Sequence, residues 1–489
     1  MFLNSFSYLE KGAATFGNEY SHPELVRMRL KYRRLRDCLT SNVKDQGTAY
    51  LPDPSEVRED PDIKRERWVK YHQRATFLPV TRRTQQGLVG QVFVRKPVIT
   101  KGNLPDAVIS SVSIQGHSLE SFSNYILSET VATGRGVVVA GISDVQGSNA
   151  SLDYVEAENV LTWAELPYGR TDALGRNIGN VVLRMFTSQL SSDGITPEMV
   201  ARLAQYRLDD NGYAFLRLCT STVDHTNWSG YVPIVAFGVH LRYLPVFPIG
   251  ADDNTLRISN PPLLELADLN ISHYVNSADY EEHVNVAGQL TTVVSGLEQK
   301  WYDKNINGKI AFGVRSPLPL PQAAKAYLLQ AQANSTAKEA MDKKEAMMVS
   351  VGARLIEQRQ VRRTATESNI EAESYHSILG HIAINVATGI SDALTALGAY
   401  YKGDAAKNGI ALNTEFGIVA TSAEHRRLLL EEWQKGIRSY SETRRALRHY
   451  DDRLDDDNVA KKEIEEGLEL LKKVASVGSK PVTGADNRT

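Results

Sequence analysis

Two histidines in the C-terminal half, His376 and His381, are of the residue type that commonly ligates zinc. Apolar residues recur every three or four positions around them, which predicts a helix. Five positions correspond to about 500° of rotation at 3.6 residues per turn, so the two rings lie on different faces. We therefore interpret both as ordinary helix residues and expect no metal site.

An acidic cluster, DDRLDDD at 451–457, carries five carboxylates of the kind that bind calcium. An EF-hand loop needs alternating ligands and a glycine at its sixth position. Counted from Asp455, the fifth and sixth positions hold Val459 and Ala460. Because acidic residues also stabilise helix N-termini, we interpret the cluster as the start of a C-terminal helix.

None of the common catalytic motifs that we sought is found in the sequence. It contains no P-loop, no HExxH zinc motif and no GxSxG nucleophile elbow. Gly134 and Gly136 precede a β-rich run and do not join a strand to a helix, as dinucleotide binding requires. Cys38 and Cys219 are too few for a four-cysteine zinc site. These observations predict a protein that is not an enzyme and holds no cofactor or metal.

An enzymatic alternative stays open. Carboxylates from distant segments could gather around metal ions and cleave DNA, as in a metal-dependent nuclease. The candidates are Glu156, Glu158, Asp268 and Asp279. None of them lies in a recognised motif, which disfavours this interpretation.

The composition is that of a folded, water-soluble chain. Its 489 residues suffice for roughly three domains. Hydrophobic residues make up 42% and charged residues 23%, which excludes disordered and collagen-like classes. There is no run of 18 apolar residues and no basic segment before an apolar core at the start. We therefore expect no membrane span, no secretory signal and a reducing compartment.

The formal net charge of −2 hides an uneven distribution. Residues 22–101 contain 18 Lys and Arg against 9 Asp and Glu, whereas residues 144–282 contain 8 against 18. Ordinary variation between solvated faces could produce this difference. Alternatively, the two stretches form surfaces that meet different things, such as a neighbouring subunit and a polyanion.

The chain divides into three parts by its periodicity. Residues 22–132 are mostly helical, with a helix starting at His22-Pro23 and carrying Val26, Leu30 and Leu35 on one face. Residues 134–250 alternate with period two and predict a mainly antiparallel sheet. The β-rich runs are 136–142, 180–186, 213–220 and 232–239.

After residue 261 the chain is again largely helical. The predicted elements are helices at 259–283 and 322–346, a strand-like segment at 347–351, a long helix at 370–400 and further helices at 423–450 and 458–474. The 259–283 and 322–346 helices bracket a short β-rich insert, and the second is rich in alanine. Alanine favours helix and allows close approach but builds little core. A ring of identical neighbours would stabilise such a pair; the alternative is a helical hairpin folded back on the β domain.

A basic stretch follows the second helix. Arg354, Arg359, Arg362 and Arg363 fall within ten residues among polar and small side chains. A solvated loop is one interpretation. In a ring, the same loop would repeat its charges around the hole, which suits sliding contact with a phosphate backbone. No aromatic residues interleave, so stacking on single strands is not expected.

The chain resembles tailed-bacteriophage portal proteins, in particular a phage and prophage family described as a domain of unknown function. The segments that carry the resemblance are WVKYHQRATF at 68–77, TRRTQQGLVGQVF at 81–93, GRGVVV at 134–139, YVEAENVLTW at 154–163, PPLLELADLNISHYVNSADY at 261–280 and RTATE at 363–367. They span most of residues 60–400, and their order gives the resemblance its specificity.

The resemblance implies an α+β portal fold. Its parts would be an N-terminal arm (1–20), a wing of helices followed by a mainly antiparallel sheet (21–258), a stem of two helices (259–283 and 321–346), a small β-containing clip (284–320), a strand and channel loop (347–369), a helical crown (370–475) and a flexible tail (476–489). The stem interface would include Ala323, Ala331, Ala337, Leu266 and Tyr274. Basic clip residues would be Lys300, Lys304 and Lys309, and the channel loop would carry the four arginines named above.

The resemblance also implies a function without catalysis. Such proteins form a ring, usually of twelve copies, at one capsid vertex, and double-stranded DNA passes through it during packaging and ejection. The implied partners are the terminase large subunit, head–tail adaptors, the major capsid protein and scaffold, with no membrane. The implied location is the virion, with assembly in the host cytoplasm. Another virion structural or adaptor protein is the alternative in this class.

Overall fold

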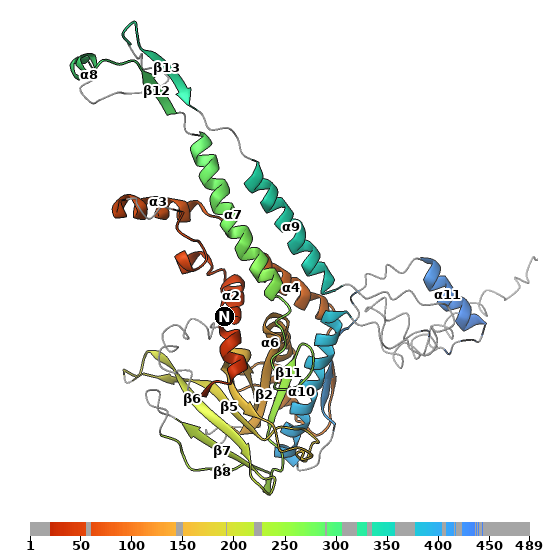
Figure 1. Ribbon diagram of the computed structural model, residues 1–489. Coiled ribbons are helices and arrows are strands. Elements are labelled where there is room, and N and C mark those ends of the chain that lie inside the picture. Colours follow the sequence, from red (N-terminus) through yellow and green to blue (C-terminus); the bar gives the residue numbers. More distant parts are fainter. Residues whose placement is uncertain are drawn as a thin grey trace, which may run out of the picture. The chain divides into compact units, whose positions relative to one another are not determined.

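The computed structural model is a mixture of α-helices and antiparallel β-sheets (Figure 1). The chain divides into two compact units, Met1–Phe416 and Gly417–Thr489, and each is described by itself. The structure describes residues 20–54, 60–142, 150–191, 193–219, 227–288, 291–305, 320–329, 335–356, 377–402, 407–414, 416, 423–435, 437, 439 and 443.

A three-stranded sheet lies at the centre of the first unit. Its antiparallel order is β11 (Val246–Gly250), β2 (Arg135–Ile142) and β3 (Ala150–Glu156). Side chains of β2 alternate between two hydrophobic cores: Val138 and Ala140 belong to the larger one, Val137 and Val139 to the other. The apolar run predicted at 136–142 is therefore a strand buried on both faces.

A five-stranded antiparallel sheet covers the second core. Its order is β4 (Val160–Ala164), β5 (Asn180–Leu190), β6 (Pro197–Leu208), β7 (Ala214–Cys219) and β8 (Val232–Pro233). A small hairpin of β9 (Val235–Ala236) and β10 (Val239–His240) follows. A 3-10 helix, Ala157–Asn159, separates β3 from β4. The antiparallel sheet predicted for 134–250 is confirmed.

Helix α10 (Ile378–Lys402) fills the larger core. It packs against α6 (Leu119–Thr133), β2, β3 and β11. By length and composition alone α10 could cross a membrane, but 61% of its most apolar stretch is buried inside the protein. The helix predicted at 370–400 is confirmed from Ile378 onward. Its apolar stripe covers the central sheet of the first unit, and its assignment to a crown stays a prediction.

The N-terminal helices are α2 (Pro23–Thr40), α3 (Pro61–Arg74), α4 (Val80–Val92) and α5 (Asp106–Ser110), with a 3-10 helix at Lys44–Ala49. The start at His22-Pro23 is confirmed, and the His22 ring accepts a hydrogen bond from the N–H of Glu24. The predicted buried face is wrong in part: Val26 and Leu30 are exposed, whereas Leu25, Met28, Tyr32 and Leu35 are buried. The true stripe is offset by about one residue from the predicted one.

After the sheets, helix α7 (Leu264–Gly288) leads to strand β12 (Thr291–Ser295) and helix α8 (Gln299–Asn305). Strand β13 (Lys325–Leu329) pairs with β12, and α9 (Thr336–Arg354) follows. The helix predicted at 322–346 is therefore wrong in its first part, because pairing with β12 overrides the helix propensity of the alanines. The strand predicted at 347–351 is also wrong, since those residues continue α9.

Two further elements complete the described chain. Strand β1 (Val98–Thr100) pairs with β14 (Gly409–Ala411), which joins the segment after α10 to the first unit. In the second unit, α11 (Ala423–Gln434) confirms the start of the helix predicted at 423–450. The helix predicted at 458–474, the acidic cluster at 451–457, His376, the N-terminal arm up to residue 19 and the tail at 476–489 lie outside the described residues.

Candidate functional site

Helices α7 and α9 run side by side, and the β12–β13 hairpin lies between them in the chain (Figure 1). We call these two helices the stalk. Polar contacts join them: Lys344 Nζ donates to the carbonyl of Ser272 at 2.9 Å, and His273 Nε2 lies 3.1 Å from Glu345 Oε1. Burial lowers the pKa of Lys344, while Asp279 opposes that shift.

The first half of α7 belongs to the core of its own chain. Leu266 and Tyr274 are fully buried, and the Tyr274 ring meets Phe77 edge to face. Asn270 Oδ1 accepts hydrogen bonds from the N–H and the hydroxyl of Thr81. Leu266 and Tyr274 therefore pack within their own chain, and their assignment to the stem interface stays a prediction. An apolar stripe on a helix predicts that the stripe is buried, but it does not show whether the same chain or another subunit covers it.

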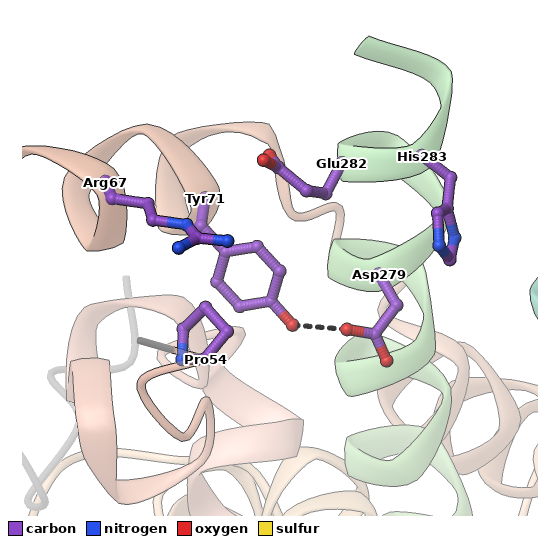
Figure 2. Close-up of a pocket in the computed structure, with 6 residues that line it drawn as sticks. All are labelled: Pro54, Arg67, Tyr71, Asp279, Glu282 and His283. Carbon is purple, nitrogen blue, oxygen red and sulfur yellow. Dashed lines mark hydrogen bonds between the residues drawn. The ribbon is translucent and has the colours of Figure 1, made fainter. Parts of the chain in front are cut away.

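Helix α3 braces α7 further along (Figure 2). Tyr71 donates a hydrogen bond to Asp279 Oδ1 at 2.7 Å, and Arg74 forms an ion pair with Glu282. Burial, followed by the hydrogen bond to Asp279, raises the pKa of Tyr71. A hollow of about 100 Å³ lies here, and its lining residues are Pro54, Arg67, Tyr71, Asp279, Glu282 and His283.

This hollow does not have the arrangement of a metal site. The Asp279 and Glu282 carboxylates already contact Tyr71 and Arg74. Within the part of the chain that the structure describes, no three His, Cys, Asp or Glu residues lie together in a way that could hold a metal ion. The contacts hold α3 against the stalk.

The four carboxylates of the nuclease alternative are held by different partners. Glu156 accepts from Tyr125, and Glu158 accepts from Arg36. Asp268 accepts from Arg34, and Asp279 accepts from Tyr71. These contacts give each carboxylate a structural role.

The basic stretch (residues 22–101) and the acidic stretch (residues 144–282) form ion pairs with each other within one chain. Three arginines of the basic stretch contact acids of the acidic stretch: Arg34 with Asp268 at 2.8 Å, Arg36 with Glu158 at 2.8 Å, and Arg74 with Glu282. Part of the complementarity predicted between different surfaces is therefore satisfied within a single copy.

The other residues predicted for the site fall in several places. Arg354 is exposed at the last position of α9, and Arg359, Arg362 and Arg363 lie outside the described residues. Lys300 and Lys304 are exposed on α8, and Lys309 lies outside. Ala337 is half-buried on α9, Ala323 lies in the turn before β13, and Ala331 lies outside. The structure thus brings Ala337 and Arg354 onto one helix.

Sequence reasoning missed the apolar residues on the stalk surface. Val349 is 73% exposed on α9, and Met347 is also exposed. Val284 and Val286 are exposed on α7. Met348 is the one buried residue among the 19 of α9, all of which are described. The apolar residues of the segment MMVSV at 347–351 could have indicated this surface, but the sequence analysis predicts a strand there.

Comparisons with known proteins give a family match over the stalk and α10. A family model described as "Domain of unknown function (DUF4055)" matches residues 262–401. No curated protein matches the chain.

Solved structures with a similar chain come from gene transfer agent (GTA) particles. A chain of "Virion of native gene transfer agent (GTA) particle" and one of "Neck of empty GTA particle computed with C6 symmetry" each have 14% identity and a TM-score of 0.39. A chain of "Neck of native GTA particle computed with C12 symmetry" has 13% identity and the same TM-score. Each similarity covers 83% of this chain and 98% of the other. At this TM-score the likeness carries no argument about function.

Proposed function

We propose that this chain is a portal subunit: a component of a ring at the head–tail junction of a phage-like particle, through which double-stranded DNA passes. The observation that carries this proposal is the exposure of α9. Nineteen residues of helix, about 28 Å long, bury one side chain and leave Val349 and Met347 in solvent.

An exposed helix of this kind needs more contacts than its own chain gives it. Tertiary packing of an apolar face supplies most helix stability in proteins. The main partner of α9 is α7, not one of the two large sheets, which disfavours a hairpin folded back on the β domain. Identical neighbours around an axis would cover the remaining apolar side chains.

Arg354 supports the conduit part of the proposal, because it ends α9 and begins the run of four arginines. Repeated in each copy of a ring, of twelve in the family that the chain resembles, these arginines would contact phosphates without reading sequence. Because contacts with a moving duplex must break readily, we predict that one or two per copy would face the lumen and that the others would pair with acids such as Glu357 and Glu367.

The proposal assigns the remaining roles to surfaces of the same ring. The hairpin of β12 and β13, with α8 and its Lys300 and Lys304, is the docking module for the terminase large subunit and later for head–tail adaptors. The body of the ring meets the major capsid protein and scaffold. The protein is not an enzyme, and it resides in the virion after assembly in the host cytoplasm.

Electron microscopy and native mass spectrometry of the purified full-length chain test the proposal. We expect closed rings with a central hole wide enough for duplex DNA and one defined mass. A compact monomer at every concentration and ionic strength would contradict it. Metal-dependent cleavage of DNA by the purified protein would favour the nuclease instead.

A further inference from the structure

The outer half of the β5–β6 hairpin extends past the other strands of its sheet (Figure 1, yellow). Strand β4 pairs with β5 only between Asn180 and Leu183, and β7 pairs with β6 only from Leu203 to Leu208. Beyond these limits β5 and β6 pair with each other as far as Leu190 and Pro197. We call residues 185–202 the β-arm. No other strand in the described part of the chain pairs with either of its edges.

The two faces of the β-arm differ. Directly paired residues of an antiparallel hairpin lie on the same face. The register pairs Phe186 with Ala201 and Leu190 with Pro197, and it places Met199 on that same face between them. The opposite face carries Met185, Arg202, Val200 and Glu198. One face is therefore mainly apolar, with Ser188 paired to Met199, while the other is mixed.

The apolar face continues a surface that is covered near the centre of the sheet. Val182 and Leu203 lie on this face and belong to the same buried hydrophobic cluster as Leu25 and Met28 of α2. Ala201, at the base of the β-arm, packs against the same cluster. Further out, Leu190 is 63% exposed, and Ile195 in the turn is 82% exposed. The cover that α2 provides thus ends before the β-arm does.

A hairpin in this situation needs a partner. A two-stranded hairpin alone is marginally stable in water, and unpaired strand edges and apolar patches are sites of association. Asp193 and Glu198 near the turn are exposed. A hydrogen bond from the Thr196 hydroxyl, with backbone N–H groups, lowers the pKa of Asp193 to about 2, so it is ionised at neutral pH. These acids repel nucleic acid, which leaves a protein surface as the occupant.

We propose that the β-arm packs its apolar face on a second copy of this chain. The inference rests on the proposed ring, in which every copy has an identical neighbour. Contact between an arm on one copy and a different surface on the next is a head-to-tail contact, the type that closes into rings. Six residue pairs at about 3.4 Å each reach roughly 20 Å beyond the sheet, far enough to cross to an adjacent subunit.

Photo-crosslinking of the full-length chain tests this contact. A photoreactive amino acid replaces Leu190 on the apolar face in one set and Glu198 on the opposite face in a matched set. Two differently tagged versions are expressed together. We expect the set with the photoreactive residue at position 190 to form an adduct that carries both tags. The set with the photoreactive residue at position 198 should form no such adduct.

Leu190→Asp gives a second measurement by sedimentation at several concentrations. Burying a carboxylate against an apolar surface is unfavourable, so we expect self-association to weaken by about tenfold or more, which is about 1.4 kcal/mol. Circular dichroism checks the fold, and because Leu190 is exposed we expect the variant to fold normally.

The outcomes separate this inference from the proposed function. Rings without a two-tag adduct from position 190, or with equal adducts from both positions, overturn the β-arm contact and leave the proposed function standing. A two-tag adduct specific to position 190 without rings supports the contact and overturns the proposed function. Unchanged association of Leu190→Asp also overturns the contact.

Discussion

Nε2 of His273 in α7 lies 3.1 Å from Oε1 of Glu345 in α9, and this contact helps to join the stalk helices. The His273 side chain is buried, whereas Glu345 is half-exposed. Contacts of this kind hold two helices in register more than they add to global stability.

Replacement of Glu345 by alanine is therefore expected to loosen α9 locally. We predict faster hydrogen exchange in the amides of α9 but a loss of about 1 kcal/mol or less in the free energy of unfolding, because half-exposed pairs contribute little. The exposed Asp342→Ala on the same helix is the control. Equal exchange in both variants would show that Glu345 does not hold α9.

Replacement of Arg36 by methionine has a larger expected effect. Arg36 Nη1 donates to Glu129 Oε1 at 2.8 Å, and its Nε donates to Glu158 Oε1 at 2.8 Å in a buried cluster. The variant leaves two carboxylates without their cation, at a cost of about 3–5 kcal/mol. Arg34→Met, which removes a partly exposed pair with Asp268, should cost about 1 kcal/mol or less. Urea unfolding of the two variants measures the difference, and similar midpoints would argue against the buried cluster.

The dependence of stability on pH tests Asp153 in β3. Burial raises its pKa from the ordinary 3.8 to about 6, while the N–H of Tyr154 opposes the shift. Because folding raises this pKa, the contribution to stability is fully present below about pH 4 and is lost as the pH rises through 6.

Asp153→Asn should therefore remove this decline. We predict a free energy of unfolding that falls less steeply than the parent's between pH 4 and 8, and that exceeds the parent's at pH 8 by up to about 3 kcal/mol. The exposed Asp193→Asn should keep the parent's decline, since the pKa of Asp193 lies at about 2, below this range. Parallel profiles for the parent and Asp153→Asn would contradict the assignment.

Gly134, between α6 and β2, adopts φ +76°, and a Cβ there would lie 3.1 Å from the carbonyl oxygen of Asn260. We predict that Gly134→Ala lowers stability by about 1–3 kcal/mol through backbone strain and this close approach. Gly175→Ala is the matched control, because Gly175 has φ +77° but open space around it. Thermal unfolding should show the larger loss at Gly134; equal losses would mean that the close approach does not matter.

Assembly is expected to depend on Val349. Val349→Asp places a carboxylate where the proposed ring buries an apolar side chain, so rings should give way to smaller species in native mass spectra. Ser350→Asp adds the same charge at the exposed neighbouring position and serves as the control. Rings that persist in the Val349 variant would place the subunit contact elsewhere.

Periodicity alone predicted several elements of the fold. The 3–4 spacing of five apolar residues predicted α10: Ile378, Ile382, Val386, Ile390 and Leu394. The last four are buried, whereas Ile378 at the start of the helix is exposed. The period of two in 134–250 predicted the antiparallel sheet. Such patterns predict an element correctly where the spacing of its own apolar residues determines which face is buried.

The misses occurred where distant partners decide the structure. Strand β6 has the sequence PEMVARLAQYRL, rich in residues that favour helix, and it was not predicted; pairing with β5 on one side and β7 on the other makes it a strand. Residues 325–329 became β13 because β12 is available to pair.

The candidate site was less predictable than the fold. The stripe that contains Leu266 and Tyr274 was recognised, but a sequence cannot tell a stripe that faces the same chain from one that faces a neighbour. The exposure of Val349 could be recognised only once the structure showed that residues 347–351 belong to α9 and not to a strand.

The alternation of β2 side chains between the two cores has a mechanical consequence. A single extended backbone is the common wall of both interiors, so a displacement on one side is transmitted to the other across one peptide layer. A shift of β2 would therefore disturb the packing of both cores at once.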